Sequence, residues 1–225
     1  MNPLCLLGLN DSHLVALNEP GHRLQAEARE AFMAMQAAAA EAGFNLMPAS
    51  SFRSFERQLA IWNGKFEGKR PLLDAHSQPL DALALSETER INAILHWSAL
   101  PGTSRHHWGT DLDIYDPDLL PEGAKLKLEP WEYQAGGYFY PLSQWLTANM
   151  ARFDFFLPFA EQHNGVAIEP WHVSYRPLAE GCASQLTLPL IADTLRLQHI
   201  AGKTHILKQL DDIFVRYIAS HSNED

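Results

Sequence analysis

The segment at residues 104–113 constrains the fold most, because it runs from a polar, imidazole-rich turn directly into a strand pattern. Polar and apolar side chains alternate after Gly109, and in a β-strand this alternation places Asp111 and Asp113 on one face. Gly109 allows a sharp turn just before the strand, which brings His106 back over Asp113. This geometry suits two ligands of one metal ion, whereas a solvated histidine-rich turn is the alternative interpretation.

The patterns along the rest of the chain predict an α+β fold, because helices and strands interleave without the regular spacing of βαβ units. Helical periodicity or capping signals mark residues 22–43, 54–62, 86–99 and 141–152, and two or three further helices are expected in the last fifty or so residues. Strand patterns mark residues 45–52, 110–115 and 166–175. Between these elements we expect a surface insertion at residues 64–85 and a long irregular loop at residues 116–137.

Composition limits the functions that the chain can have. Apolar residues make up 46% of the 225 residues, which is enough for a sizeable core. The net charge of −10 argues against binding to nucleic acid or to an anionic membrane surface. The two cysteines, Cys5 and Cys182, do not make a thiolate metal site. The apolar N-terminus lacks a basic region, so we expect a cytoplasmic protein, or a periplasmic or cell-envelope protein if an export signal has been removed.

A second polar segment, residues 168–175, brings Glu169 and His172 close together in the chain. In a regular strand these two side chains point to opposite faces. Proline is tolerated in strands mainly at edges and bulges, so we predict an irregular backbone near Pro170 and Trp171 that turns both side chains to one site. A surface glutamate beside a packed histidine is the alternative interpretation.

Together the two segments supply two imidazoles and a carboxylate of the types that bind zinc, with a glutamate to spare. A catalytic zinc ion takes three protein ligands and lowers the pKa of a water in its fourth position to about 7. A carboxylate outside the ligand set can then act as a general base. A third segment places Arg53 at a strand-to-helix junction, where its guanidinium could hold a substrate carboxylate or a developing oxyanion. An exposed arginine at a helix start is the alternative.

Three motifs follow one another along the chain, namely Ser51-Phe52-Arg53-Ser54 with Gln58, then residues 101–113, then Glu169-Pro170-Trp171-His172. In this order they resemble the motifs of the VanY-type D-alanyl-D-alanine carboxypeptidases. That family belongs to a group of zinc peptidases that includes lysostaphin-like enzymes and shares a fold with the hedgehog signalling domain. The similarity covers roughly residues 8–180, and the ordered triple is far more specific than any one motif.

The resemblance implies one Zn²⁺ ion held by His106, Asp113 and His172, with Glu169 as the catalytic base. It also implies a small antiparallel sheet that carries the zinc site and is flanked by helices, with extra helices at the C-terminus. We expect a single peptidase domain over residues 1–225. Its parts would be a motif-bearing core at about residues 8–180, an insertion at residues 64–100 and a helical extension at residues 186–225.

On the substrate side, the resemblance implies that Arg53 stabilises the oxyanion of the scissile carbonyl. Gln58 and Ser104 would then line the site for the terminal residues of the substrate. The chain departs from the family pattern at Phe52, which stands where a tyrosine is usual, and at Asp111, which adds negative charge near the zinc.

Three further points concern residues near these motifs. His107 is an extra imidazole beside His106 and a rival for its role, although the family spacing counts from His106. The aromatic side chains at residues 131–140 are expected to pack in the core, with one wall of a substrate cleft as the alternative. The remaining histidines, including His163 and His221, are expected to be ordinary packed or surface groups.

The function implied by the resemblance is that of a zinc-dependent D,D-carboxypeptidase, which hydrolyses the terminal D-Ala-D-Ala bond of peptidoglycan-type peptides. A D-Ala-D-Ala dipeptidase or a stem-peptide endopeptidase of the same zinc family is the first alternative. A non-catalytic, hedgehog-like zinc-binding module is the second. The expected partner is a peptide that ends in D-Ala-D-Ala, and neither nucleic acid nor a membrane is expected.

Overall fold

A four-stranded antiparallel sheet with the strand order β3–β6–β8–β7 forms the centre of the computed structural model, which describes residues 1–161 and 165–219. The strands are β3 (Met47–Ser50), β6 (Asp111–Tyr115), β8 (His172–Tyr175) and β7 (Phe155–Phe156). The register between β6 and β8 sets Asp113 opposite His172. Two predicted ligands that are distant in the sequence are therefore neighbours across one strand pair.

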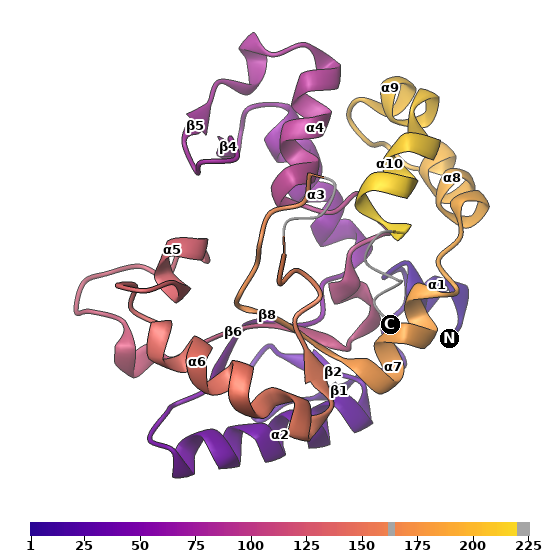
Figure 1. The fold of residues 1–225 in the computed structure, drawn as a ribbon. Coiled ribbons are helices and arrows are strands. Elements are labelled where there is room, and N and C mark those ends of the chain that lie inside the picture. Colours follow the sequence, from indigo (N-terminus) through magenta and orange to yellow (C-terminus); the bar gives the residue numbers. More distant parts are fainter. Residues whose placement is uncertain (162–164, 220–225) are drawn as a thin grey trace.

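The two faces of the sheet differ in chemistry. On one face, Leu112 points into a hydrophobic core shared with α2 (Ala26–Glu41) and α6 (Tyr140–Asn149), as the alternation predicts. Both helices lie on the same side of the sheet (Figure 1). Because side chains alternate along a strand, Asp113 and His172 lie on the opposite face, where they are buried rather than solvated.

A second hydrophobic core lies on the other side of the sheet from α2 and α6 (Figure 1). The helices around it are α3 (Phe55–Phe66), α4 (Glu87–Trp97), α7 (Arg176–Ala183), α8 (Leu188–Leu197), α9 (Lys203–Lys208) and α10 (Leu210–Tyr217). Trp62 of α3 and Ile213 of α10 are among its buried residues. The expected C-terminal helices are confirmed within the described residues, and residues 220–225 lie outside them.

The remaining elements are short. They are α1 (Pro3–Leu6), β1 (Val15–Ala16), β2 (Arg23–Leu24), β4 (Leu72–Leu73), β5 (Pro79–Leu80), α5 (Pro130–Tyr133) and the 3-10 helices η1 (Ala82–Ala84), η2 (Arg105–Trp108), η3 (Pro117–Leu119) and η4 (Met150–Phe153). Leu72 and Ala82 are buried in the second core, so the segment expected as a surface insertion is partly internal. None of the described helices combines the length and apolarity needed to cross a bilayer. The division into core, insertion and extension stays a prediction.

Local signals set several element boundaries as expected. The Ser54 hydroxyl accepts a hydrogen bond from the backbone N–H of Arg57 and caps α3. Ser86 and Glu89 form a capping box at the start of α4. Gly43 has a φ of +88°, which ends the helical segment that precedes it.

Several expected elements are shorter than their patterns, among them β3, and two of them have a clear local cause. The helix expected from residue 22 begins at Ala26, because residues 23–24 pair instead with β1. The strand expected over residues 166–175 is regular only from His172, because Pro170 and Trp171 lie in a turn. In both cases a local pairing or turn overrides the periodicity of the side chains.

Candidate active site

The turn before β6 holds His106 over the sheet. His106 lies in η2, and Gly109 ends this short helix in the left-handed region with a φ of 70°. A Cβ atom at Gly109 would lie 2.2 Å from Cδ2 of Leu14, so both the backbone conformation and the space favour glycine. The turn brings Nε2 of His106 to 3.3 Å from Oδ2 of Asp113. The geometry expected from residues 104–113 is therefore present.

The irregular backbone predicted near Pro170 is also present. The backbone N–H of His172 donates to the carbonyl of Glu169 over 3.1 Å, which closes a tight turn at the start of β8. As a result, Nδ1 of His172 lies 3.3 Å from Oε2 of Glu169 and 3.2 Å from Oδ1 of Asp113. Two side chains that a regular strand would separate therefore face one site.

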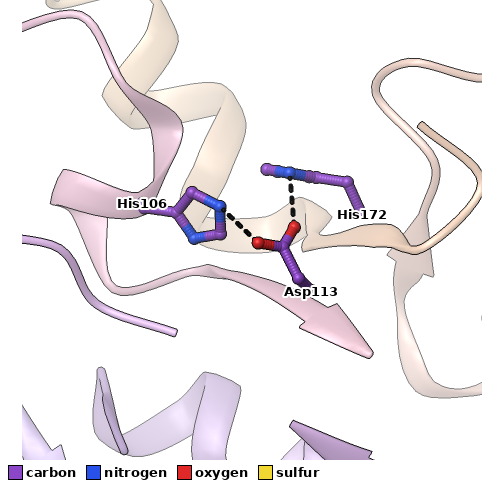
Figure 2. A group of neighbouring side chains, drawn as sticks. All are labelled: His106, Asp113 and His172. Carbon is purple, nitrogen blue, oxygen red and sulfur yellow. Dashed lines mark ion pairs between the residues drawn. The ribbon is translucent and has the colours of Figure 1, made fainter. Parts of the chain in front are cut away.

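His106, Asp113 and His172 form a compact buried cluster (Figure 2). One potential ligand atom from each residue lies within 4.8 Å of the others, and the three side chains are at most 7% exposed. Two imidazoles and a carboxylate without a thiolate are a donor set suited to a catalytic zinc ion. The cluster thus fits the metal that the sequence motifs imply.

The surroundings of His172 give a second reason why a cation fits this cluster. Its Nδ1 faces carboxylate oxygens of Asp113 and Glu169, so a positive charge is required there. Although burial by itself lowers the pKa of His172, hydrogen bonds to Asp111, Asp113 and Glu169 raise this pKa well above its usual value. A metal ion bound at Nδ1 would satisfy the same carboxylates that otherwise favour a proton.

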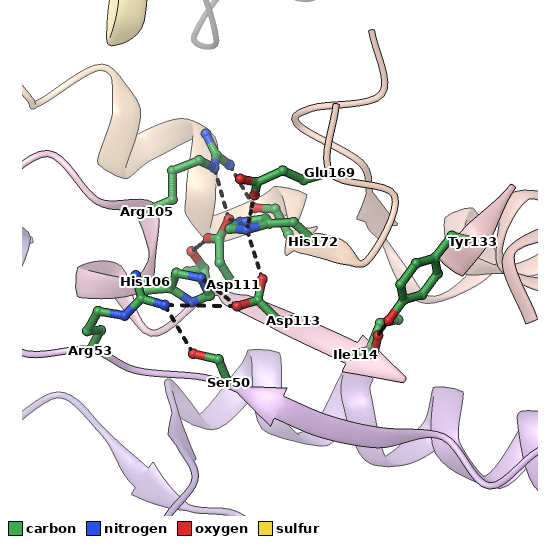
Figure 3. Close-up of polar contacts among 12 residues, drawn as sticks. Ser50, Arg53, Arg105, His106, Asp111, Asp113, Ile114, Tyr133, Glu169 and His172 are labelled. Carbon is green, nitrogen blue, oxygen red and sulfur yellow. Dashed lines mark hydrogen bonds and ion pairs between the residues drawn. The ribbon is translucent and has the colours of Figure 1, made fainter. Parts of the chain in front are cut away.

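Asp111 lies behind His172 and fixes its orientation (Figure 3). Oδ1 of this fully buried aspartate lies 2.9 Å from Nε2 of His172 and accepts a hydrogen bond from Nε of Arg105 over 2.9 Å. Arg105 also donates from Nη2 to the Ser174 hydroxyl over 2.7 Å. Burial alone would raise the pKa of Asp111, but Arg105 and His172 hold it well below its usual value. The proton of His172 is therefore drawn to Nε2, which leaves the Nδ1 lone pair for a metal.

Arg53 reaches the cluster from the junction between β3 and α3. Its Nη2 lies 3.9 Å from Oδ2 of Asp113, and its Nη1 donates to Oε1 of Gln58 over 3.0 Å. Gln58 is fully buried and donates from Nε2 to the carbonyl of Ala99 over 2.7 Å. Gln58 therefore positions the guanidinium from behind, and its predicted contact with substrate stays a prediction.

His107 is engaged in hydrogen bonds to the backbone, so it is not an alternative to His106 as a metal ligand. Its Nδ1 lies 2.6 Å from the carbonyl of Arg53, and its Nε2 accepts a hydrogen bond from the backbone N–H of Gly102 over 3.2 Å. Burial lowers the pKa of His107 to about 3, so the ring is neutral. Both ring nitrogens of His107 are engaged by the backbone, so of these two neighbouring histidines only His106 faces Asp113.

A cavity of about 360 Å³ opens onto the cluster. Among its lining residues are Arg53, Ser104, His106, Asp113, Glu169 and His172. Ser104 thus lies where the sequence predicts, although its contact with substrate stays a prediction. Lys65, Arg70 and residues 127–129 also line the cavity, and no sequence motif indicated them. Tyr133 and Phe139 are buried in the core with α2, as expected, whereas Trp131 is 40% exposed. The aromatic lining of the cavity comes from other segments, for example Trp97 and Trp171. His163 and His221 lie outside the described residues.

Several solved structures share this fold. VanYB in complex with D-alanine-D-alanine is 22% identical with a TM-score of 0.55, over 82% of this chain and 90% of that one. The LD-carboxypeptidase LdcB is 22% identical with a TM-score of 0.54, over 79% and 76%. A vancomycin-resistance D,D-pentapeptidase VanY in complex with Zn(II) is 22% identical with a TM-score of 0.53, over 87% and 90%. At this level of identity the likeness concerns the fold, which is of the VanY type.

The family itself is shown by sequence. The model of the family described as VanY, D-alanyl-D-alanine carboxypeptidase, matches residues 21–178, so the chain belongs to this family and is a peptidase. Two relatives from Haemophilus influenzae, both described only as uncharacterized proteins, are also similar. One is 46% identical over 121 residues, or 53% of this chain and 92% of the relative, and the other is 48% identical over 103 residues, or 44% and 70%.

Proposed function

We propose that this protein is a zinc-dependent D,D-carboxypeptidase, which hydrolyses the terminal D-Ala-D-Ala bond of peptidoglycan-type peptides. The observation that carries the proposal is the meeting of two imidazoles and an aspartate with Glu169 at one cavity. Membership of the VanY family supports the choice of bond. His106, Asp113 and His172 would hold the ion, which would supply Lewis acidity and make a hydrolytic water ionise near neutral pH.

Glu169 is the residue that we assign as general base. Its carboxylate lines the cavity, is 17% exposed and lies beside His172 without belonging to the compact ligand set. In the proposed reaction it takes a proton from the attacking water as the carbon–oxygen bond forms. It then gives that proton to the leaving amine as the carbon–nitrogen bond of the peptide breaks. A carboxylate outside the ligand set has no purpose in a purely structural zinc site.

Arg53 is assigned to the oxyanion of the scissile carbonyl. The guanidinium keeps its charge at any working pH, and Gln58 holds it so that it borders the cavity near Asp113. A preorganised cation stabilises the negative charge that develops in the transition state without the cost of reorienting solvent. Ser104 would line the site for the terminal residues of the substrate.

Release of free D-alanine from a peptide that ends in D-Ala-D-Ala tests the proposal. The purified protein loaded with zinc should release D-alanine, and chelation should stop the release until zinc is restored. Glu169→Ala should abolish release while the protein still binds one equivalent of zinc. Activity retained by Glu169→Ala would remove this residue from its role, and zinc binding without turnover would indicate a non-catalytic module.

Product analysis identifies the bond that is cleaved. A carboxypeptidase acts on a pentapeptide and releases one D-alanine, whereas a dipeptidase acts only on free D-Ala-D-Ala. An endopeptidase would instead produce internal fragments of the stem peptide. Mass spectrometry of the products from the dipeptide and the pentapeptide separates the three activities in one experiment.

A further inference from the structure

Lys65, in the last turn of α3, is a half-buried cation without an anionic partner. Its Nζ donates to the hydroxyl of Ser98 over 2.7 Å, and it forms no ion pair with any residue in the described ranges 1–161 and 165–219. Lys69, only four positions later, is exposed and pairs with Glu67 over 2.6 Å. The lack of an ion pair is therefore specific to Lys65, because a nearby lysine in the same part of the chain does form one.

Holding an ammonium group in this environment is unfavourable. Burial lowers the pKa of Lys65 to about 8; Glu169 opposes this shift, whereas Arg53 and Arg70 add to it. A neutral hydroxyl satisfies one of the three N–H donors of the ammonium, but it does not compensate its charge. A carboxylate placed next to Nζ would compensate the charge.

The position of Lys65 connects this unpaired charge to the proposed reaction. Lys65 and Ser98 line the same cavity as Arg53 and Glu169. Arg70, Arg105 and Lys127 line it as well, so five cationic side chains border one cavity in a chain with a net charge of −10, although Arg105 is paired with Asp111. On the α3 side, Arg53 lies just before this helix, Lys65 lies in it and Arg70 follows it. Ser98 follows directly after α4. A peptide in this cavity therefore meets positive charge on the α3 side of the metal cluster.

We propose that Lys65 and Ser98 form a carboxylate-binding subsite of the cleft, which selects substrates by a carboxylate that does not itself react. The proposal rests on the proposed peptidase function. Two carboxylates of a stem peptide have the required chemistry. One is the C-terminal carboxylate of the leaving residue, and the other is the side-chain carboxylate of a diamino diacid further along the peptide.

A purely structural role for Lys65 makes different predictions. If Lys65 served only to link α3 to Ser98, it would support the fold, and its loss would weaken the binding of every peptide to the same extent. A subsite instead discriminates between ligands that differ only in one carboxylate. The test therefore compares matched pairs of peptides and not a single substrate.

Binding is measured calorimetrically on the zinc-loaded Glu169→Gln protein, in which no turnover occurs. The first ligand pair is a peptide that ends in D-Ala-D-Ala as the free acid and the same peptide as the C-terminal amide. The second pair is a stem peptide with diaminopimelate or with lysine at its third position. The affinity of each peptide is measured for the Glu169→Gln protein, which serves as the parent. It is also measured for the same protein with Lys65→Met, with Lys65→Arg or with the surface control Lys69→Met.

We expect the parent protein to prefer the carboxylate-bearing member of one pair, and Lys65→Met to remove that preference by weakening only that member about 10- to 100-fold, as for a hydrogen bond to a charged group. Lys65→Arg should retain most of the preference, and Lys69→Met all of it. The pair that responds identifies which carboxylate is bound. An equal loss for both members of a pair, or an unchanged preference in Lys65→Met, would overturn the subsite.

The peptidase function is judged separately by D-alanine release from the protein with Glu169 intact. If that protein binds peptides with a Lys65-dependent preference but releases no D-alanine, then the proposed reaction fails and the subsite stands. If D-alanine is released but the preference does not depend on Lys65, then the reaction stands and the subsite fails.

Discussion

At the scale of single residues, the carboxylate of Asp111 controls which nitrogen of His172 is available for a metal. The aspartate is fully buried, and Arg105 compensates its charge. A histidine that donates its second N–H to a carboxylate is held in one tautomer and is a more basic ligand. Asp111 would thus act on the proposed metal ion through His172, as a positioning residue.

We predict that Asp111→Asn lowers the zinc affinity of the protein about 10- to 100-fold, the usual cost of losing such an outer partner. The amide lacks the charge that anchors both His172 and Arg105. Competition with a chromophoric chelator measures the affinity, and the visible spectrum of the cobalt-substituted protein reports the coordination directly. Asp193→Asn, an exposed change of the same chemistry, is the control, and equal affinities in both variants would contradict the role.

The protonation of Lys65 gives a pH dependence of peptide binding. Its pKa of about 8 lies below the usual value mainly because of burial; Glu169 raises it, whereas Arg53 and Arg70 lower it further. The ammonium is present below this pH and is lost above it, so the affinity for a carboxylate-bearing peptide should fall as the pH rises through about 8. Lys65→Arg should show no such fall in that range, because its guanidinium stays charged. Identical pH profiles for the two proteins would refute the assignment.

At the scale of elements, the turn between η2 and β6 is the feature that gathers the ligands. Gly109 permits this turn through its left-handed backbone conformation and its lack of a Cβ atom. The tight turn between Glu169 and His172 does the same for the start of β8. Each predicted ligand motif is therefore a regular strand joined to an irregular turn.

We expect Gly109→Ala to destabilise the protein by about 2 kcal/mol or more, from the left-handed conformation and the contact with Leu14. Gly181→Ala is the matched control, because Gly181 lies in α7 with open space around it. That replacement should stabilise the protein by about 0.5–1 kcal/mol. Urea unfolding followed by circular dichroism measures both. A loss of equal size in the two variants would show that the turn has no special demand for glycine.

The sequence predicts these elements where the signal is local. The alternation from Asp111 to Asp113 predicts the face of β6, and Pro170 predicts the break before β8. The hydrogen bond between Asp111 and His172 depends on the pairing of two strands that are distant in the sequence, and periodicity carries no information about that pairing. The predicted helix over residues 54–62 stops short of Lys65, which falls in the expected surface insertion. In the structure α3 extends to Phe66, and no sequence pattern indicates that Lys65 lines the cavity.

At the scale of the whole molecule, the C-terminal helices support the wall of the active site. The indole N–H of Trp62 donates to the carbonyl of Ala201 over 3.1 Å, and Asn63 hydrogen-bonds to the backbone of His199 and Ala201. These contacts attach α3, which carries Lys65, to the connection between α8 and α9. The region beyond the sequence motifs is therefore part of the same packed unit as the cavity wall.

Truncation of a buried side chain in α8 tests this coupling. Leu195 is fully buried in the second core, and Leu195→Ala should cost about 2–5 kcal/mol of unfolding free energy. Leu197→Ala, an exposed change in the same helix, should cost well under 1 kcal/mol. Chemical denaturation measures both values. A small cost at Leu195 would mean that the C-terminal helices are not part of the core.

The contacts that attach α3 to the connection between α8 and α9 determine which property of the protein would be lost first. The residues proposed to hold zinc lie on the sheet and its turns, while the lysine proposed to select peptides lies on a helix that is anchored by the C-terminal helices. Mutations confined to the C-terminal helices would therefore yield a protein that still binds its metal ion but no longer distinguishes peptides by their carboxylates.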